Sequence, residues 1–466
     1  MKKNLCLAAL ILCTGFAGYA GAQQAKSSGE QRTAAHFRAI HNRPLMVAAF
    51  LEQMPKGGDL HNHLTGAIYA ESYIQTAARE GLCVDRQALA FTAAPCSDTQ
   101  ATAARALQDP VLYRQLIDSL SMRGLRPAES GHDHFFDTFG KFRLAARAHP
   151  AELIAEVASR AAAQHESYLE LFLNPDHAAS AQLGAKLGWD NNFTAMRDKL
   201  LAGGLRDIGT HAAQSLDQTD ADARKILCAA PESPACKMEV RYIYEVYREF
   251  PKEQFFALTL AGFEMASTDP RVVAVNPVMP EDGFVSMRDY ELHMRIFEFM
   301  HKVYPSVHIS MHAGELAPGL VPPEGLKSHI RQAVEIAHAE RIGHGVDVFY
   351  EDRPLELLKE MAQKKVVVEI CLSSNDQILG IRGDQHPLPE YLRAGVPVVI
   401  ATDDEGVARS SMTREYQRAV ATYDLSYPQL KQIVRNSIAY SFANRETRAR
   451  LLKDLEERFR EFEGQF

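Results

Sequence analysis

Short apolar runs that alternate with amphipathic stretches are the feature that most constrains the fold of this chain. Each run is short enough to be one buried strand. The runs cover residues 58–64, 168–173, 240–246, 255–261, 307–311, 341–348, 366–372 and 398–402. Eight strand–helix units in succession predict a closed parallel barrel of the α/β class, a (β/α)8 TIM barrel.

The stretches between the runs have apolar residues at three-to-four spacing, which is typical of helices packed on a sheet. Examples are residues 151–164, 287–302, 327–339 and 355–364. The alternative is an open doubly wound sheet, which would place a glycine-rich phosphate-binding turn after an early strand. Gly57 and Gly58 stand at the beginning of their strand instead, so the barrel is favoured.

The 466 residues exceed what one barrel needs, and the excess falls in defined segments. We expect a signal peptide over residues 1–22, an N-terminal helical arm over 23–54, the barrel over 55–445 and a C-terminal helix over 446–466. Two intervals, near 81–150 and 184–237, are too long for one crossover helix and predict helical insertions. The first insertion ends in phenylalanines at helical spacing, suited either to the core or to the roof of an active site: Phe135, Phe136, Phe139 and Phe142.

The N-terminus predicts export. Lys2 and Lys3 precede the apolar residues 5–17, and Ala20-Gly21-Ala22 has the small residues at which signal peptidase cuts. A retained membrane anchor is the alternative, but the run is short, and no later segment has 18 uninterrupted apolar residues. We therefore expect a periplasmic or secreted protein with no stable membrane insertion after cleavage.

The cysteines fit an oxidising compartment. Cys83 with Cys96, and Cys228 with Cys236, are close in sequence and lie in polar, turn-rich segments, which suggests two local disulfides. Cys371 lies in an apolar run and is expected to be a buried thiol. The chain has no Cys-x-x-Cys pair, so neither a thiolate zinc site nor thioredoxin chemistry is supported.

The charge balance argues against a nucleic-acid partner. Lys and Arg total 51 against 59 Asp and Glu, a net charge of −8, and no stretch concentrates basic residues into a stripe that would neutralise phosphates. The sequence leaves a homodimer open.

Polar residues gather where several predicted strands end, and in a barrel those ends meet at one mouth. His61 and His63 are two residues apart at the end of the first strand, so both face the same side. Such a pair alone is common by chance, but His312 and Asp403 end two further strands. Together the four residues form a set of three nitrogens and one oxygen suited to one Zn²⁺ per chain, with a position left for water.

Three more polar residues at these strand ends suit hydrolytic chemistry. Glu315 can supply an acid, His344 can help to remove a proton from water, and Asp404 can accept a hydrogen bond. Taken singly, His344 would more often be a hydrogen-bonded core residue, and Asp404 or Glu405 a helix cap. The combined set suits attack on an electrophilic carbon with proton delivery to the leaving group.

Five segments in this order resemble the adenosine deaminase family of the amidohydrolase superfamily, particularly its secreted branch related to the adenosine deaminase growth factors. They are MPKGGDLHNHL (54–64), HAGE (312–315), RIGHG (341–345), CLSSN (371–375) and TDD (402–404). The resemblance covers most of residues 54–440. It implies zinc-dependent hydrolysis of adenosine or 2′-deoxyadenosine to the inosine product and ammonia, with a purine nucleoside as the partner.

The resemblance also implies roles for single residues. It assigns zinc to His61, His63, His312 and Asp403. Glu315 would then donate a proton to purine N1, His344 would orient and deprotonate the water, and Asp404 would position the hydroxide or the ring. Gly262, in the segment 260–264, resembles the glycine on strand four whose backbone meets the purine.

Two positions depart from the family pattern. Thr65 stands where an acid commonly meets the sugar, and Glu405 stands where many members have proline. An uncharged hydroxyl predicts loose discrimination at the sugar. AMP should be a poor substrate, because no lysine or arginine cluster lies among the strand-end motifs.

Rival functions remain open at this point. Another amidohydrolase-superfamily hydrolase or a different 6-aminopurine deaminase would share most of these residues. The two-metal members use a modified lysine on a middle strand, and the predicted fourth strand, residues 255–261, has none. A non-catalytic secreted binding or signalling protein would be expected to have lost Glu315 or His344. The cytidine-type deaminases need His-x-Glu and Pro-Cys-x-x-Cys, which this chain lacks.

Overall fold

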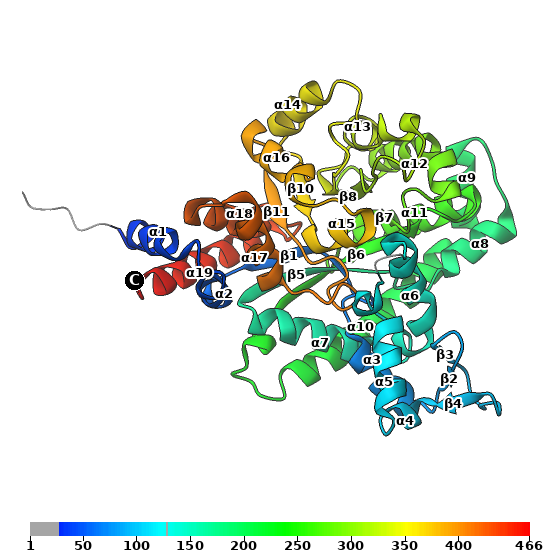
Figure 1. The fold of residues 1–466 in the computed structure, drawn as a ribbon. Helices are drawn as coiled ribbons and strands as arrows, with labels where there is room; N and C mark the ends of the chain where they lie inside the picture. The colour runs from blue at the N-terminus through cyan, green and yellow to red at the C-terminus, as the bar shows by residue number, and fades with distance from the viewer. Residues whose placement is uncertain (1–27, 127–128) are drawn as a thin grey trace, which may run out of the picture.

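A computed structural model describes residues 28–126 and 129–466. Eight parallel strands form a barrel at the centre, and helices surround it (Figure 1). The strands are β1 (Gly57–His63), β5 (Glu166–Leu173), β6 (Glu239–Tyr247), β7 (Val272–Val278), β8 (His308–Ala313), β9 (Arg341–His344), β10 (Val367–Ile370) and β11 (Val398–Ile400). They neighbour one another in this same order, so the predicted (β/α)8 barrel is confirmed.

The barrel closes between its first and last strands at a single parallel bridge. Asn62 pairs with Asp403, just beyond the end of β11. The backbone N–H of His63 donates to the carbonyl of Asp403 (3.1 Å), and the N–H of Asp403 donates to the carbonyl of His61 (2.9 Å). The closure therefore holds three predicted metal ligands, His61, His63 and Asp403, side by side.

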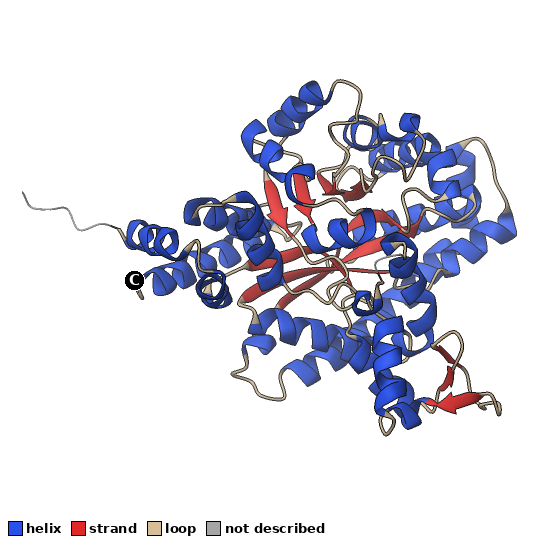
Figure 2. Cartoon of the chain, in the orientation of Figure 1, coloured by secondary structure: helices blue, strands red, loops and turns tan. Residues whose placement is uncertain are grey.

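Helices cover the outside of the barrel, as Figure 2 shows in blue around the red strands. They are α3 (Ala70–Arg79), α7 (Pro150–Ala163), α8 (Ala179–Leu187), α11 (Lys252–Thr268), α12 (Phe284–Val303), α13 (His329–Glu335), α14 (Pro354–Lys364), α15 (Leu372–Leu379), α16 (Leu388–Ala394), α17 (Met412–Tyr423) and α18 (Tyr427–Ala439). The four helical stretches named from periodicity fall within or across α7, α12, α13 and α14.

The predicted fourth strand is wrong. Residues 255–261 lie in the helix α11, and the fourth strand is β7, which the sequence reading missed. Every residue of α11 from Phe255 to Phe263 is buried, and the helix packs on both β6 and β7. A helix buried on all sides has the continuous apolar run of a strand, so periodicity cannot separate the two.

β7 was not predicted because its apolar run is interrupted. Asn276 and Pro277 lie inside it, and proline has no N–H to donate to a sheet. One predicted strand is a helix and one true strand was not predicted, so the predicted number of eight strands is right although the fourth strand was placed wrongly.

The first insertion, residues 81–150, is not purely helical. It contains an antiparallel sheet of β2 (Cys83–Asp85), β3 (Ala90–Thr92) and β4 (Gln100–Thr102), followed by α4 (Ala103–Ala106), α5 (Pro110–Ser119) and α6 (Gly131–Ala146). Such three-residue strands are too short for an alternating pattern to predict them. The second insertion is helical as expected, with α9 (Phe193–Ala202) and α10 (Leu205–Leu227) after α8.

The cysteine predictions are confirmed. Cys83 is bonded to Cys96 beside the small sheet, and Cys228 is bonded to Cys236 after α10. Cys371 is a buried free thiol at the end of β10.

The two ends of the described chain pack together. The arm consists of α1 (Gly29–Ile40) and α2 (Pro44–Gln53), and α19 (Arg445–Glu463) lies beside them (Figure 1). Phe50 of α2 contacts Phe37 and Phe462, which joins all three helices through aromatic rings. The predicted signal peptide, residues 1–22, lies outside the described residues. Within the described ranges, no helix combines the length and apolar character needed to cross a bilayer.

Candidate metal centre and its pocket

A pocket of about 690 Å³ opens at the carboxyl ends of the barrel strands. Its inner end is lined by His63, His312, His344 and the pair Asp403 and Asp404. One wall comes from α6, whose phenylalanines 135, 136, 139 and 142 all line it. Two of those rings, at 135 and 142, are also fully buried, so the cluster belongs to the core and to the pocket roof at once.

The four predicted metal ligands lie together at the inner end. The nearest ligating atoms of His61, His63, His312 and Asp403 all lie within 4.8 Å of one another. Nε2 of His63 is 3.2 Å from Nε2 of His312, and Oδ1 of Asp403 is 3.4 Å from Nε2 of both His61 and His63. Nε2 of His61 is buried without a hydrogen-bond partner, which is costly unless a cation meets it. The residues present therefore fit a metal ion.

Charge at this end supports the same conclusion. Burial lowers the pKa of His61, but the carboxylates of Asp403 and Glu369 outweigh it and raise that pKa to about 10. Burial would raise the pKa of Asp403, yet the nearby imidazoles, including that of His61 with its Nε2 3.4 Å from Oδ1, hold it well below its usual range. The buried carboxylates thus favour positive charge beside them, which either a protonated His61 or a metal ion supplies.

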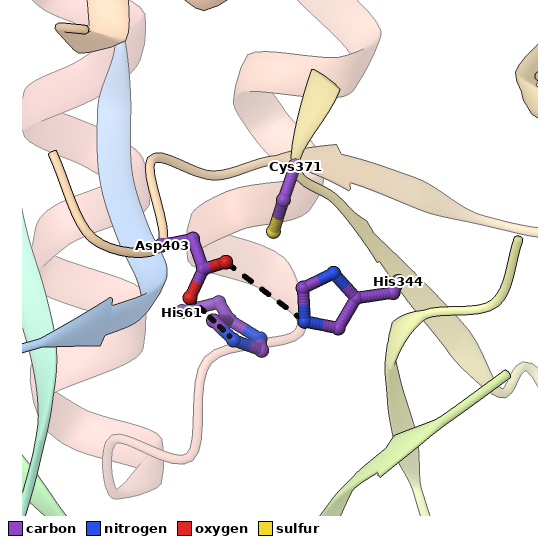
Figure 3. A group of neighbouring side chains, drawn as sticks. All are labelled: His61, His344, Cys371 and Asp403. Carbon is purple, nitrogen blue, oxygen red and sulfur yellow. Dashed lines mark ion pairs between the residues drawn. The ribbon is translucent and has the colours of Figure 1, made fainter. Parts of the chain in front are cut away.

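A second donor set overlaps the first. Figure 3 shows Cys371 beside His61, His344 and Asp403, and the ligating atoms of these four also lie within 4.8 Å of one another. A cysteine binds metal as the thiolate. Burial and the neighbouring carboxylates raise the pKa of Cys371 well above its usual value, and its thiol donates to the backbone carbonyl of Glu369 (3.7 Å), so the histidine-rich set is favoured.

Each metal-facing histidine is held from behind by an acceptor. Nδ1 of His61 lies 2.7 Å from Oε2 of Glu369, and Nδ1 of His63 lies 3.0 Å from Oε1 of Glu245. Nδ1 of His312 likewise lies 2.6 Å from Oδ1 of Asn276. These contacts place the proton on Nδ1 and leave Nε2 free to bind a metal.

Sequence reasoning missed those three acceptors. Asn276 lies in the strand that was not recognised. Glu369 did leave a signal, because it is a lone carboxylate in the apolar run 366–372, and a buried acid needs a partner.

His344 is oriented by a buried chain of hydrogen bonds. The backbone N–H of Leu388 donates to Nδ1 of His386 (3.1 Å), so the proton of neutral His386 is on Nε2, 3.0 Å from Oδ1 of Asn375. The amide of Asn375 then donates from Nδ2 to Nδ1 of His344 (3.0 Å). With the amide assigned from this network, neutral His344 carries its proton on Nε2, facing the pocket. Burial lowers the pKa of His344 to about 4, which keeps it neutral.

Glu315 and Asp404 are carboxyls that can hold a proton. Oε1 of Glu315 lies 3.7 Å from Nε2 of His344, and the backbone N–H of Glu315 donates to Glu281. Burial and then the charge of Asp403 raise the pKa of Glu315 well above its usual range. The same two causes raise the pKa of Asp404, whose Oδ1 is buried without a hydrogen-bond partner.

The remaining three predicted positions differ in where they lie relative to the pocket. Thr65 lines the pocket, as a sugar contact would require. Gly262 does not, and its predicted substrate contact is wrong because it lies in α11, where an added Cβ would meet Tyr244 and Val275. Its small size serves the packing of helix on sheet. Glu405 is buried away from the pocket and pairs with Arg160.

The acceptors behind the histidines generate a first prediction. Glu245→Ala should weaken zinc affinity by about 10- to 100-fold, because His63 loses the group that fixes its ring and tautomer. Competition with a chromogenic chelator measures this affinity. Glu239→Ala, at the other end of the same strand, is the matched control and should leave the affinity unchanged. Equal affinities for wild type and Glu245→Ala would contradict the proposed support.

Comparison with known families gives one extended match and several partial ones. The adenosine deaminase family profile matches residues 125–458, well over half of the chain. The adenosine deaminase of Clostridium acetobutylicum is 30% identical over 167 residues, which cover 36% of this chain and 46% of that protein. The adenosine deaminase of Enterococcus faecalis is 33% identical over 138 residues, covering 29% and 37%. The chain thus spans about half the length, or less, of these curated relatives.

Solved structures share the fold over most of the chain. An adenine deaminase from Arthrobacter aurescens superposes with a TM-score of 0.56 at 18% identity, covering 86% of this chain and 98% of that one. The N6-methyl-AMP deaminase of Arabidopsis thaliana gives a TM-score of 0.59 at 20% identity, covering 88% and 98%. The structures share the fold, and the extent of the profile match shows that the chain belongs to the adenosine deaminase family.

Proposed function

We propose that the protein is a zinc-dependent hydrolase that deaminates adenosine and 2′-deoxyadenosine to the inosine product and ammonia, with one zinc per chain. The observation that carries the proposal is one pocket end that combines a set of three histidines and an aspartate with two carboxyls able to hold protons. Family membership supports the reaction class.

A zinc ion held by the four ligands would supply a Lewis acid that makes water nucleophilic near neutral pH. His344 donates a hydrogen bond from Nε2 and so orients the attacking oxygen. A neutral imidazole with its proton on Nε2 cannot accept another there, so the hydrogen-bond chain favours the orienting role over the deprotonating one. Glu315, with its raised pKa, delivers a proton to the ring nitrogen, and Asp404 positions the nucleophile or the ring.

The rival functions lose support in the same pocket. β7 replaces residues 255–261 as the fourth strand, and it too contains no lysine, so the argument against a two-metal site holds on the corrected strand. Oε1 of Glu315 and Nε2 of His344 lie 3.7 Å apart at the inner end of the pocket. A catalytic site needs both groups there, whereas a vestigial site would be expected to have lost one of them.

Export is part of the proposal. The residues that suggest a signal peptide lie outside the described ranges. Two disulfides in the described chain support a periplasmic or secreted protein, because disulfides persist mainly in oxidising compartments.

The proposed acid can be tested directly. Glu315→Gln should keep its zinc, because Glu315 is not a proposed ligand, yet deaminate adenosine about 10²-fold more slowly or worse. Loss of the adenosine absorbance band measures the rate, and elemental analysis measures the zinc. The exposed Glu324→Gln is the matched control and should behave as wild type. Near-wild-type turnover with glutamine at 315 would refute the assigned acid.

The sugar contact generates a separate prediction. Thr65 offers an uncharged hydroxyl, worth about 0.5–1.5 kcal/mol per hydrogen bond. Adenosine and 2′-deoxyadenosine should therefore differ by less than about tenfold in kcat/KM, and Thr65→Val should cost about tenfold at most. A preference of about a hundredfold for either sugar in the wild type would show that a stronger contact reads the ribose.

A further inference from the structure

Two arginines line the pocket at the end of the α6 wall. Arg143 lies in the last turn of α6, and Arg147 is its C-cap residue. Both line the same pocket as the metal-facing histidines, and both are exposed. They continue the helical stripe of Phe136 and Phe139, so one face of α6 runs from aromatic rings to guanidinium groups.

Neither arginine is used by the protein itself. Within the described residues, no ion pair or side-chain hydrogen bond involves Arg143 or Arg147, whereas Arg160 of the following helix is paired with Glu156 and Glu405. Arg147 also lies close enough to the pocket-lining Tyr247 to lower its pKa, although burial is the larger effect and raises that pKa overall. Two unpaired cations one helical turn apart therefore face the same space.

The charged side chains that line the pocket fall into an acidic group beside the metal-facing histidines and a pair of arginines on the α6 wall. The acidic lining residues, Glu245, Glu315, Asp403 and Asp404, all belong to the metal-binding end. The arginine side chains of the lining are Arg143 and Arg147, and they carry positive charge in a chain whose net charge is −8. A ligand with a basic heterocycle at the metal and an anionic group at its other end would match this arrangement.

Hydroxyl groups stand on the same pocket surface. Ser215 and Thr219 of α10 line it together with the two arginines. Paired guanidinium groups with neighbouring hydroxyls are the donors that recognise phosphate in proteins.

We propose that Arg143 and Arg147 form a subsite for the 5′-phosphate of a purine nucleotide, so that the pocket accepts 6-aminopurine 5′-monophosphates as well as nucleosides. This inference rests on the proposed function for the orientation of the purine toward the metal. It revises the expectation that AMP is a poor substrate, which considered only the strand-end motifs. The two cations come from an insertion helix that those motifs do not include.

Binding of the unreactive products tests the subsite without catalysis. Calorimetry should show that IMP binds the zinc-loaded protein more tightly than inosine. In the double variant Arg143→Gln/Arg147→Gln, IMP should bind about tenfold more weakly, because both charge-assisted contacts are lost, while inosine binding changes by less than about twofold. Arg143→Lys/Arg147→Lys should restore part of the IMP affinity, and added NaCl should weaken IMP but not inosine.

A matched double variant separates local recognition from overall charge. Arg105 and Arg114 lie in the same insertion, are exposed and do not line the pocket, so Arg105→Gln/Arg114→Gln removes the same charge elsewhere. The inference is overturned if IMP and inosine bind wild type equally, if Arg143→Gln/Arg147→Gln weakens both ligands alike, or if the control weakens IMP as much.

Turnover separates this inference from the proposed function. The ratio of kcat/KM for AMP to that for adenosine should fall about tenfold in Arg143→Gln/Arg147→Gln and stay constant in the control. Deamination of adenosine with an unchanged ratio would refute the subsite alone. Selective IMP binding with no deamination of any 6-aminopurine would refute the proposed function alone.

Discussion

The parallel bridge between Asn62 and Asp403 is the constraint on which the site depends. It closes the barrel, and the same backbone hydrogen bonds set His61 and His63 against Asp403. Without closure, the first and last strands would be opposite edges of an open sheet, and the histidines of β1 would have no carboxylate beside them. The metal centre is therefore a consequence of barrel topology rather than of any local motif.

Closure also buries charge, and the barrel interior balances it through a continuous network. Arg341 is 1% exposed and lies between Glu170 and Glu369, at 2.6 and 2.7 Å. Glu369 then accepts from His61, whose other nitrogen faces Asp403. Removing one member of such a network leaves an uncompensated buried charge, which is far more destabilising than removing an exposed ion pair. The network links the stability of the barrel to the orientation of a metal ligand.

The sequence allowed the prediction of much of the site because strand ends in a barrel converge wherever the intervening chain goes. His61, His63, His312 and Asp403 could be grouped from their positions alone. The fourth strand could not, because a fully buried helix and a buried strand share an apolar run, and Pro277 interrupts the true one. Gly262 was consequently expected at the substrate, whereas it lies within the helix α11 and packs against the sheet.

Residues that reach the pocket from insertions left no positional signal. Arg143 and Arg147 lie on a helix whose placement over the barrel depends on packing between distant segments, including contacts of α6 with α3 and α15. The chain from His386 through Asn375 to His344 is likewise tertiary, although Asn375 stood within a segment that resembles the family. Sequence patterns thus predicted the chemistry at the metal better than the recognition of the rest of the substrate.

X-ray absorption at the zinc K edge of the zinc-loaded protein tests the central claim most directly, because two donor sets share His61 and Asp403 and differ in sulfur. The proposed set of three histidines and an aspartate predicts a first shell of nitrogen and oxygen only, at about 2.0–2.2 Å. A sulfur neighbour at about 2.3 Å would place the metal on Cys371 and His344 instead. That result would contradict both the ligand assignment and the role of His344.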